Sequence, residues 1–138
     1  MNSKIVKSKT VQELEDWLSH EIGSLYSNKL GQQPGEITCQ LFEAKLAVVL
    51  EESVTHLERM LISANHDRMV HQIRTTLNRS LQTRISHLLE ETAGVAVIDF
   101  LSSTTFDTRR TGMIIFFEDA PAVTDPYVIP KYKSVKNS

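Results

Sequence analysis

Cysteines and long apolar runs are what this 138-residue sequence most clearly lacks. A single cysteine, Cys39, excludes an internal disulfide framework and is typical of proteins in reducing compartments. No apolar run approaches the roughly 20 residues that a bilayer-spanning helix needs. The N-terminal segment contains no hydrophobic signal region. We therefore expect a cytoplasmic protein without direct membrane insertion, which would reach a membrane only through a protein partner.

Strong net charge and the common catalytic motifs are absent as well. Lys and Arg number 15 against 17 Asp and Glu, a balance of −2 that argues against a protein built mainly for nonspecific nucleic-acid binding. None of the five histidines has a second histidine four residues away or a cysteine nearby, so no metal site is predicted. The sequence contains no GxSxG motif, no P-loop and no dinucleotide fingerprint. We expect no enzymatic activity, no cofactor and no nucleic-acid partner.

A first amphipathic helix is predicted near the N-terminus. Thr10 and Glu13 form a capping-box pattern, in which each side chain can satisfy a backbone amide at the helix start. Apolar residues then recur at helical spacing, and Gly31 is the first of the residues that end the helix. The periodic residues are Val11, Leu14, Leu18, Ile22 and Leu25.

A second helical stretch opens with another capping-box pattern, Thr55 and Glu58, and its periodicity runs to about Thr92. As one straight helix it would be about 55 Å long, which exceeds a domain of this size. The polar segment around Asn65 is the predicted break, because Asn tolerates the left-handed conformation and Asp67 can cap the next helix. We therefore expect a short helix and then a long one.

Two pairs of strands complete the predicted fold. Alternating or apolar segments indicate strands at 37–42, 46–50, 95–103 and 113–118, and Gly94 ends the long helix before the second pair. The order helix, strand, strand, helix, helix, strand, strand predicts an α+β fold, with helices on one face of a four-stranded antiparallel sheet. We expect one domain over residues 10–119, between a flexible N-terminus (1–9) and a flexible, proline-containing tail (120–138).

The last two strands are apolar on both faces, which predicts a dimer. A sheet with helices on one face ordinarily has a second face in contact with water, so a second apolar face needs cover. A second copy of the chain is the expected cover. One set of alternating residues comprises Ala96, Ile98, Phe100, Ile114 and Phe116, and the other comprises Val97, Leu101, Met113, Ile115 and Phe117.

The predicted loop 102–111 is rich in hydroxyls and arginines and is the candidate anion-binding site. Hydroxyls and loop amides donate to anions, and an arginine can hold a carboxylate, bicarbonate or phosphate through two hydrogen bonds. The alternative is a long solvated hairpin loop whose Asp and Thr side chains bond their own backbone. The candidate residues are Thr104, Thr105, Asp107, Thr108, Arg109 and Arg110.

One arginine of the long helix is predicted to be buried. A helical wheel places Arg84 inside an apolar stripe and Arg74 near its edge. A charge among leucines needs a partner, and Asp99, which interrupts an apolar strand, is one candidate. A structural ion pair or a dimer contact is expected rather than catalysis. The stripe consists of Met69, Ile73, Leu77, Leu81 and Leu88.

The tail and the last strand pair supply further candidate contacts. Tyr127 and Tyr132 lie near prolines, which lower the cost of ordering an extended peptide that docks in a groove. A tail without any docking role is the alternative. Candidate partner or dimer contacts are therefore Tyr127 and Tyr132 together with Arg84, Asp99 and Phe100.

Several blocks together resemble the YbcI-like family, also called the MpsC-like domain. These are the Gly31 to Gly35 entry to the first hairpin, the helix-opening segment Ser53 to Leu61, the closing block Glu90 to Val97, and the strand residues Leu101 to Ser103 and Phe116 to Glu118. Ala93 stands where the family usually has Thr, and the tail lies outside the pattern. The resemblance implies this α+β fold and an association with an inorganic-carbon or ion-translocating membrane system.

Three functions are therefore weighed. The leading hypothesis is a non-enzymatic regulatory or accessory protein, a homodimer that acts through protein contacts with an unknown partner, such as a membrane-associated complex. The alternative is a domain that senses a small anion (bicarbonate or phosphate) or a nucleotide through residues 102–111. Nucleic-acid binding is third, and it would require an affinity that falls steeply with salt.

Overall fold

Three helices and four strands make up the part of the chain that the computed structural model describes, residues 9–123. The predicted order of elements is confirmed. In sequence they are α2 (Val11–Leu30), β1 (Ile37–Phe42), β2 (Lys45–Leu50), α3 (His56–Ser63), α4 (Asp67–Ala93), β3 (Val97–Thr105) and β4 (Arg110–Phe117).

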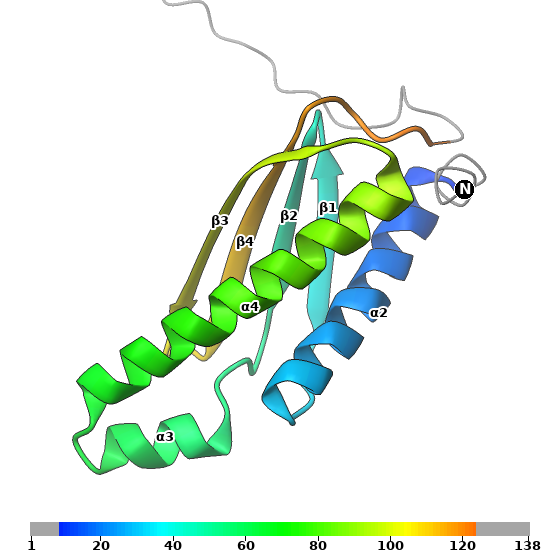
Figure 1. Ribbon diagram of the computed structural model, residues 1–138. Helices are drawn as coiled ribbons and strands as arrows, with labels where there is room; N and C mark the ends of the chain where they lie inside the picture. The colour runs from blue at the N-terminus through cyan, green and yellow to red at the C-terminus, as the bar shows by residue number, and fades with distance from the viewer. Residues whose placement is uncertain (1–8, 124–138) are drawn as a thin grey trace, which may run out of the picture.

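The strands form one antiparallel sheet in the order β1-β2-β4-β3, so that β2 and β4 are central. Helices α2 and α4 lie over the same face of this sheet, with α4 running diagonally across it, and α3 projects beyond one end (Figure 1). The predicted α+β fold is thus confirmed. Between residues 9 and 123, no helix has the length and hydrophobicity that crossing a membrane requires.

The local signals at the first two helix starts are confirmed. The amide of Glu13 donates to the hydroxyl of Thr10 at 3.1 Å, and the amide of Thr10 donates to the carboxylate of Glu13 at 3.0 Å. Thr55 and Glu58 form the second capping box at the start of α3. Gly31 ends α2 with a left-handed φ of 71°, which an L side chain rarely adopts.

The predicted break between the two later helices is confirmed, but its cap is not. Asn65 adopts the left-handed conformation with φ 64°. His66 occupies the N-cap position of α4 without a side-chain capping bond, and Asp67 is the first helical residue. The carboxylate of Asp67 therefore meets the positive end of the helix dipole instead of accepting a capping bond. Gly94 ends α4 with φ 68°, as predicted.

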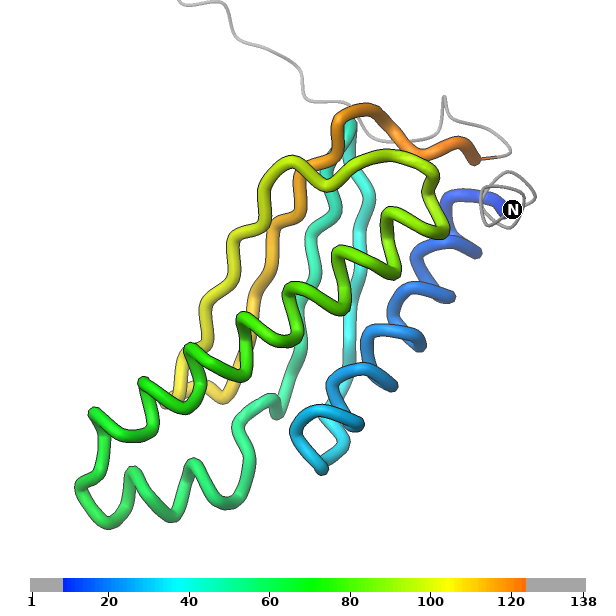
Figure 2. The backbone as a smooth tube through the Cα atoms, in the orientation of Figure 1, coloured from blue at the N-terminus to red at the C-terminus, as the bar shows by residue number. Residues whose placement is uncertain are grey.

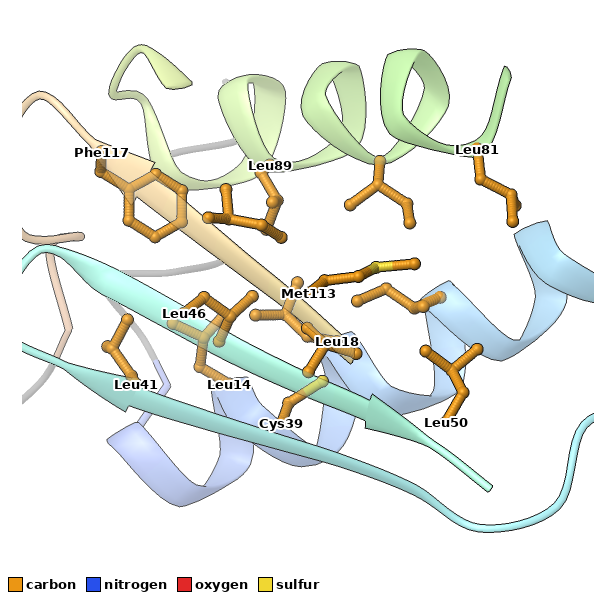
Figure 3. Packing of buried hydrophobic residues seen from close by; sticks show 14 of the residues in the cluster. Leu14, Leu18, Cys39, Leu41, Leu46, Leu50, Leu81, Leu89, Met113 and Phe117 are labelled. Carbon is orange, nitrogen blue, oxygen red and sulfur yellow. The ribbon is translucent and has the colours of Figure 1, made fainter. Parts of the chain in front are cut away.

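The core lies between the helices and one face of the sheet. Figure 3 shows leucines of α2 and α4 converging on strand side chains, where Cys39 lies among the apolar residues. Burial of this many apolar side chains is the main favourable term in folding. The labelled residues are Leu14 and Leu18 of α2, Leu81 and Leu89 of α4, and Cys39, Leu41, Leu46, Leu50, Met113 and Phe117 of the strands.

The buried face of α4 differs from the predicted stripe. Arg84 is exposed, and Met69 is 47% exposed, whereas Arg74 is buried. Two apolar stripes overlap on this helix: the predicted one, and one that includes Val70, Leu81, Ile85 and Leu89. The second stripe is the buried one, because α4 packs against α2, α3 and β3. The prediction of a buried Arg84 was therefore wrong within the single chain. The buried residues of α4 are Val70, Arg74, Leu81, Ile85, Leu89, Thr92 and Ala93.

A β-bulge changes which side chains of β3 face the core. The register shifts between Val97 and Asp99, so Phe100 pairs with Ile115 and packs against the core. Leu101 points to the opposite face and is 54% exposed. Because a bulge inserts one residue, the simple alternation predicted for this strand fails at Ile98.

The segment after β4 is not a free tail at its start. Residues 120–123 were expected to be flexible, yet Val123 is 8% exposed and belongs to the core cluster, and Ala120 packs against it. Figure 2 shows this segment turning over the end of the sheet toward the start of α2. The expectations for 1–8 and for 124–138 lie outside the described residues.

Candidate functional site

The predicted loop 102–111 is mostly strand. Strand β3 continues to Thr105 and β4 begins at Arg110, so only residues 106–109 form the turn. Thr104 pairs with Thr111 across the two strands, and their hydroxyls are hydrogen-bonded at 2.8 Å. The hydroxyls of Thr105 and Thr108 bond each other at 2.6 Å. The long solvated loop of the sequence-based interpretation is therefore wrong, and most of its threonine hydroxyls are already paired.

Arg109 in the turn and Arg110 at the start of β4 both contact carboxylates. Arg110 donates through Nε to Oε1 of Glu51 at 2.7 Å, and Arg109 Nη1 lies 3.6 Å from Oε2 of Glu52. All four side chains are substantially exposed, so water screens these pairs and each contributes little to stability. An anion at this turn would compete with Glu51 and Glu52 for the guanidinium groups. Anion binding by Arg109 and Arg110 stays a prediction without a new observation in its favour.

A buried ion pair that the sequence did not reveal joins α3 to α4. Arg74 donates through Nε to Oε2 of Glu58 at 2.8 Å, and its Nη2 contacts Oε1 of the same carboxylate. Burial by itself would raise the pKa of Glu58, but hydrogen bonds from Arg74 and Thr55 outweigh it and lower that pKa. Burial likewise opposes the charge of Arg74, and the bond to Glu58 leaves the pKa of Arg74 raised. Both groups are held in their charged forms.

The ion pair continues into a network around Ser53. The carbonyl of Ser53 accepts hydrogen bonds from Arg74 Nη2 at 2.6 Å and from the hydroxyl of Tyr26. The side chain of Ser53 bonds the hydroxyl of Thr111 at 2.7 Å. These bonds connect α2, the segment before α3, α4 and β4. Buried polar groups must be paired, and here each group's partner comes from a different element.

The candidate contact residues occupy separate places. Arg84 is exposed on α4, and the carboxylate of Asp99 accepts from the amide of Phe100 at 2.9 Å. In the described range 9–123, no ion pair joins Arg84 to Asp99. Phe100 packs toward the helices and is not available to a partner on the other face. Tyr127 and Tyr132 lie outside the described residues.

The sheet face opposite the helices is the candidate interface, which we call the open face. Its three cross-strand rows are Thr38, Val49, Gly112 and Ser103; Gln40, Ala47, Ile114 and Leu101; and Phe42, Lys45, Phe116 and Asp99. Leu101 is 54% and Val49 38% exposed, and Ile98 at the bulge beside it is 65% exposed. Within residues 9–123, no helix lies over this face (Figure 1). The predicted second apolar face is present, but Phe100 and Leu101 lie on the opposite faces from those predicted.

Comparisons with known proteins place the domain in a family. The family model described as "Na+-translocating membrane potential-generating system (MpsC)" matches residues 10–119. No curated protein and no solved structure matches the chain. The matched range includes every helix and strand of the described structure. The resemblance seen in the sequence is thereby confirmed, and the chain belongs to the MpsC family.

Proposed function

We propose that this chain is a non-enzymatic accessory or regulatory protein that acts through protein contacts and forms a homodimer through its open face. The observation that carries the proposal is the exposure of Ile98, Leu101 and Val49 on a face that no described helix covers. Full burial of one such side chain contributes about 1.5–3 kcal/mol. Burial of the apolar patch on this face would therefore favour association.

The charges on the open face favour a second copy as its occupant. Lys45 and Asp99 lie in one row with Phe116 between them. Lys45 pairs with Glu43 within the chain, and a twofold axis running along β4 would also bring Lys45 of one copy beside Asp99 of the other, twice. Isologous interfaces require this self-complementarity, and face-to-face sheets pack about 10 Å apart with nearly aligned strands.

The family description gives the proposed setting. The chain belongs to a family described by a Na+-translocating, membrane potential-generating system. In our proposal it serves such a system from the cytoplasm, as a component that contacts other proteins and performs no chemistry itself. In this proposal, the dimer is the form that binds the other proteins of the system.

Oligomeric state tests the proposal directly. Light scattering at micromolar concentration should give twice the chain mass of 15.6 kDa for the wild type. Leu101→Lys places a charge in the central row and should produce a monomer, because burial of an unpaired charge is unfavourable. Met60→Lys is the matched control, since Met60 is 68% exposed on α3, away from the sheet. It should leave the dimer intact.

Two results would overturn the dimer: a monomeric wild type, or a Leu101→Lys variant with the wild-type mass. Purification of the tagged protein from native lysate then tests the accessory role. Subunits of an ion-translocating complex should be recovered with the wild type and with Met60→Lys. Recovery of no such subunit with either protein would count against the proposed setting while leaving the dimer standing.

A further inference from the structure

A polar cleft of about 550 Å³ lies between α4 and β3. On β3 the side chains that face the helices change from Phe100, which packs on the core, to Ser102 and Thr104, which line the cleft. Opposite them, Arg74 and Asn78 lie four residues apart and therefore on one face of α4. The apolar interface between helix and sheet thus becomes polar at this end.

Unpartnered polar atoms gather at this cleft. Arg74 Nη1, Asn78 Oδ1 and Ser102 Oγ are buried without a hydrogen-bond partner, and they are three of the four such side-chain atoms in the described range. The Arg74 residue is only 3% exposed. Buried donors and acceptors without partners are rare and costly, so these three atoms need partners that the chain does not supply, which are ordered water or a ligand in the cleft.

The cleft is built rather than accidental. Asn78 donates through Nδ2 to the hydroxyl of Thr104 at 3.2 Å, which orients its carbonyl oxygen. Arg74 is fixed by Glu58 and by the carbonyl of Ser53, which leaves Nη1 as its remaining free nitrogen. A donor and an acceptor are therefore held in place before any ligand arrives, and preorganisation of this kind lowers the cost of binding.

We infer that this cleft binds a small organic oxyanion that carries a hydroxyl group near its charged end. Arg74 Nη1 is a donor for an oxyanion oxygen, and Asn78 Oδ1 is an acceptor that needs a hydroxyl. Glu58 pairs with the other nitrogens of Arg74 from behind, so the net positive charge of the cleft comes from Arg79, which also lines the wall. Within residues 9–123, no Asp or Glu is among the lining residues themselves. The hydroxyl of Ser102 can donate to the oxyanion of the ligand or accept from the hydroxyl of the ligand.

The cleft is large enough for an organic anion. Pockets for small molecules typically measure about 300–1,000 Å³, and this one falls within that range. Phe106 forms part of the wall, with its ring edge-on to His71 at 4.9 Å between centroids. That end of the cleft suits the carbon skeleton of the ligand. Phosphate and carboxylate groups share the required chemistry.

This inference does not depend on the proposed dimer, because the cleft lies on the helix-covered side of the sheet. It overlaps only in part with the site predicted at 102–111, because Ser102, Ser103, Thr104 and Phe106 of that range line the cleft. Of the candidate residues there, only Thr104 lines the cleft, whereas Arg109 and Arg110 face Glu52 and Glu51.

Calorimetry on the full chain in phosphate-free buffer tests the inference with two pairs of probes. Glycerol 3-phosphate is compared with propyl phosphate, and glycerate with propionate, so that each pair differs in hydroxyl groups. At least one hydroxylated probe should bind with a Kd of about 1 mM or lower, and more tightly than its partner. Which of the two binds identifies the oxyanion as phosphate or carboxylate. Failure of both, or equal binding within each pair, would overturn the inference.

Matched variants locate the site. Asn78→Asp replaces the acceptor amide by a carboxylate and should weaken binding by about tenfold or more through repulsion. Gln72→Glu makes the same change on α4 outside the cleft and should leave the affinity within about twofold. Ser102→Ala removes only a hydroxyl from the cleft and is therefore a second test in case Asn78→Asp does not fold. It should weaken binding severalfold. Wild-type affinity in both Asn78→Asp and Ser102→Ala would show that the cleft is not the site.

Discussion

Arg74 of α4 and Glu58 of α3, 16 residues apart in the chain, form an ion pair whose side chains are only 4% and 2% exposed. Glu58 has a second role, because the same carboxylate accepts from the amide of Thr55 at 2.9 Å and closes the capping box of α3. One carboxylate thus starts α3 and attaches it to α4. The attachment matters because α3 projects beyond the end of the sheet (Figure 1).

Removal of Arg74 should be strongly destabilising. Arg74→Ala leaves Glu58 buried without its counter-ion, and breaking a buried pair in this way typically costs about 3–5 kcal/mol. Arg84→Ala on the same helix is the control, since Arg84 is exposed and such changes usually stay within about 0.5 kcal/mol. Urea unfolding followed by circular dichroism measures both. Equal midpoints for the two variants would mean that Arg74 is not the buried arginine.

Glu58 should make the protein less stable in acid. Its pKa is lowered on folding because the hydrogen bonds and charge of Arg74 outweigh burial. A group of this kind contributes its full stabilisation above its unfolded pKa, about 4.3 for Glu, and loses it as the pH falls through the lower folded value. The unfolding free energy of the wild type should therefore fall steadily below about pH 5.

A comparison of two variants assigns this acid dependence. Glu58→Gln cannot titrate, so its unfolding free energy should decline less between neutral pH and acid than that of the wild type. Glu13 also has a lowered pKa, through bonds from Thr10, but it is exposed at the start of α2. Glu13→Gln should therefore keep most of the wild-type decline. A Glu58→Gln curve parallel to the wild-type curve would refute the assignment.

Cys39 should react slowly in the folded protein. Burial raises the pKa of its thiol to about 11, because the effect of burial is larger than the opposing effect of a hydrogen bond from Ser19. The thiolate is the reactive form, so at pH 8 alkylation by iodoacetamide should be about a hundredfold slower in the native chain than in guanidinium. Mass spectrometry follows the reaction. Similar rates in both conditions would place Cys39 outside the core.

Replacement by alanine should destabilise the protein at Gly31 but not at Gly112. Nothing lies within 4 Å of a Cβ at either position, so space is not limiting. Gly31 has a φ of 71°, and Gly31→Ala should cost about 1 kcal/mol or slightly more for the left-handed backbone. Gly112 lies in β4 without a positive φ, so Gly112→Ala should be neutral or mildly stabilising. Thermal unfolding distinguishes them, and a costlier change at Gly112 would contradict the expectation.

Features that depend on a few neighbouring residues could be predicted from the sequence. The two capping boxes were predicted correctly, since their partners lie three residues apart. Gly31 and Gly94 were identified as helix ends because few other residues adopt the required φ. The cap expected from Asp67 failed because Asp67 lies one position inside the helix, where its side chain makes no capping bond.

The candidate site was predicted only in part. The helical wheel predicted a buried stripe of α4 that included Arg84, because Met69, Ile73 and Leu77 are as apolar as the residues that are in fact buried. The spacing of Leu81, Ile85 and Leu89 was the available signal for the true face, and extending it toward the N-terminus reaches Leu77 and then Arg74. The choice was not local, since α2, α3 and β3 all contact α4.

The order of the elements, the two capping boxes and an apolar second face of the sheet could all be predicted from the sequence, because they depend on periodicity and on hydrogen bonds between close neighbours. Only the tertiary structure decided which arginine is buried, which carboxylates face the hairpin turn, and that α4 and β3 enclose a polar cleft. Arg110 and Glu51 are 59 residues apart, and Asn78 and Thr104 are 26 apart. Such pairs form when packing of the whole core sets the position of α4 over the sheet, and no local pattern in either segment encodes that position.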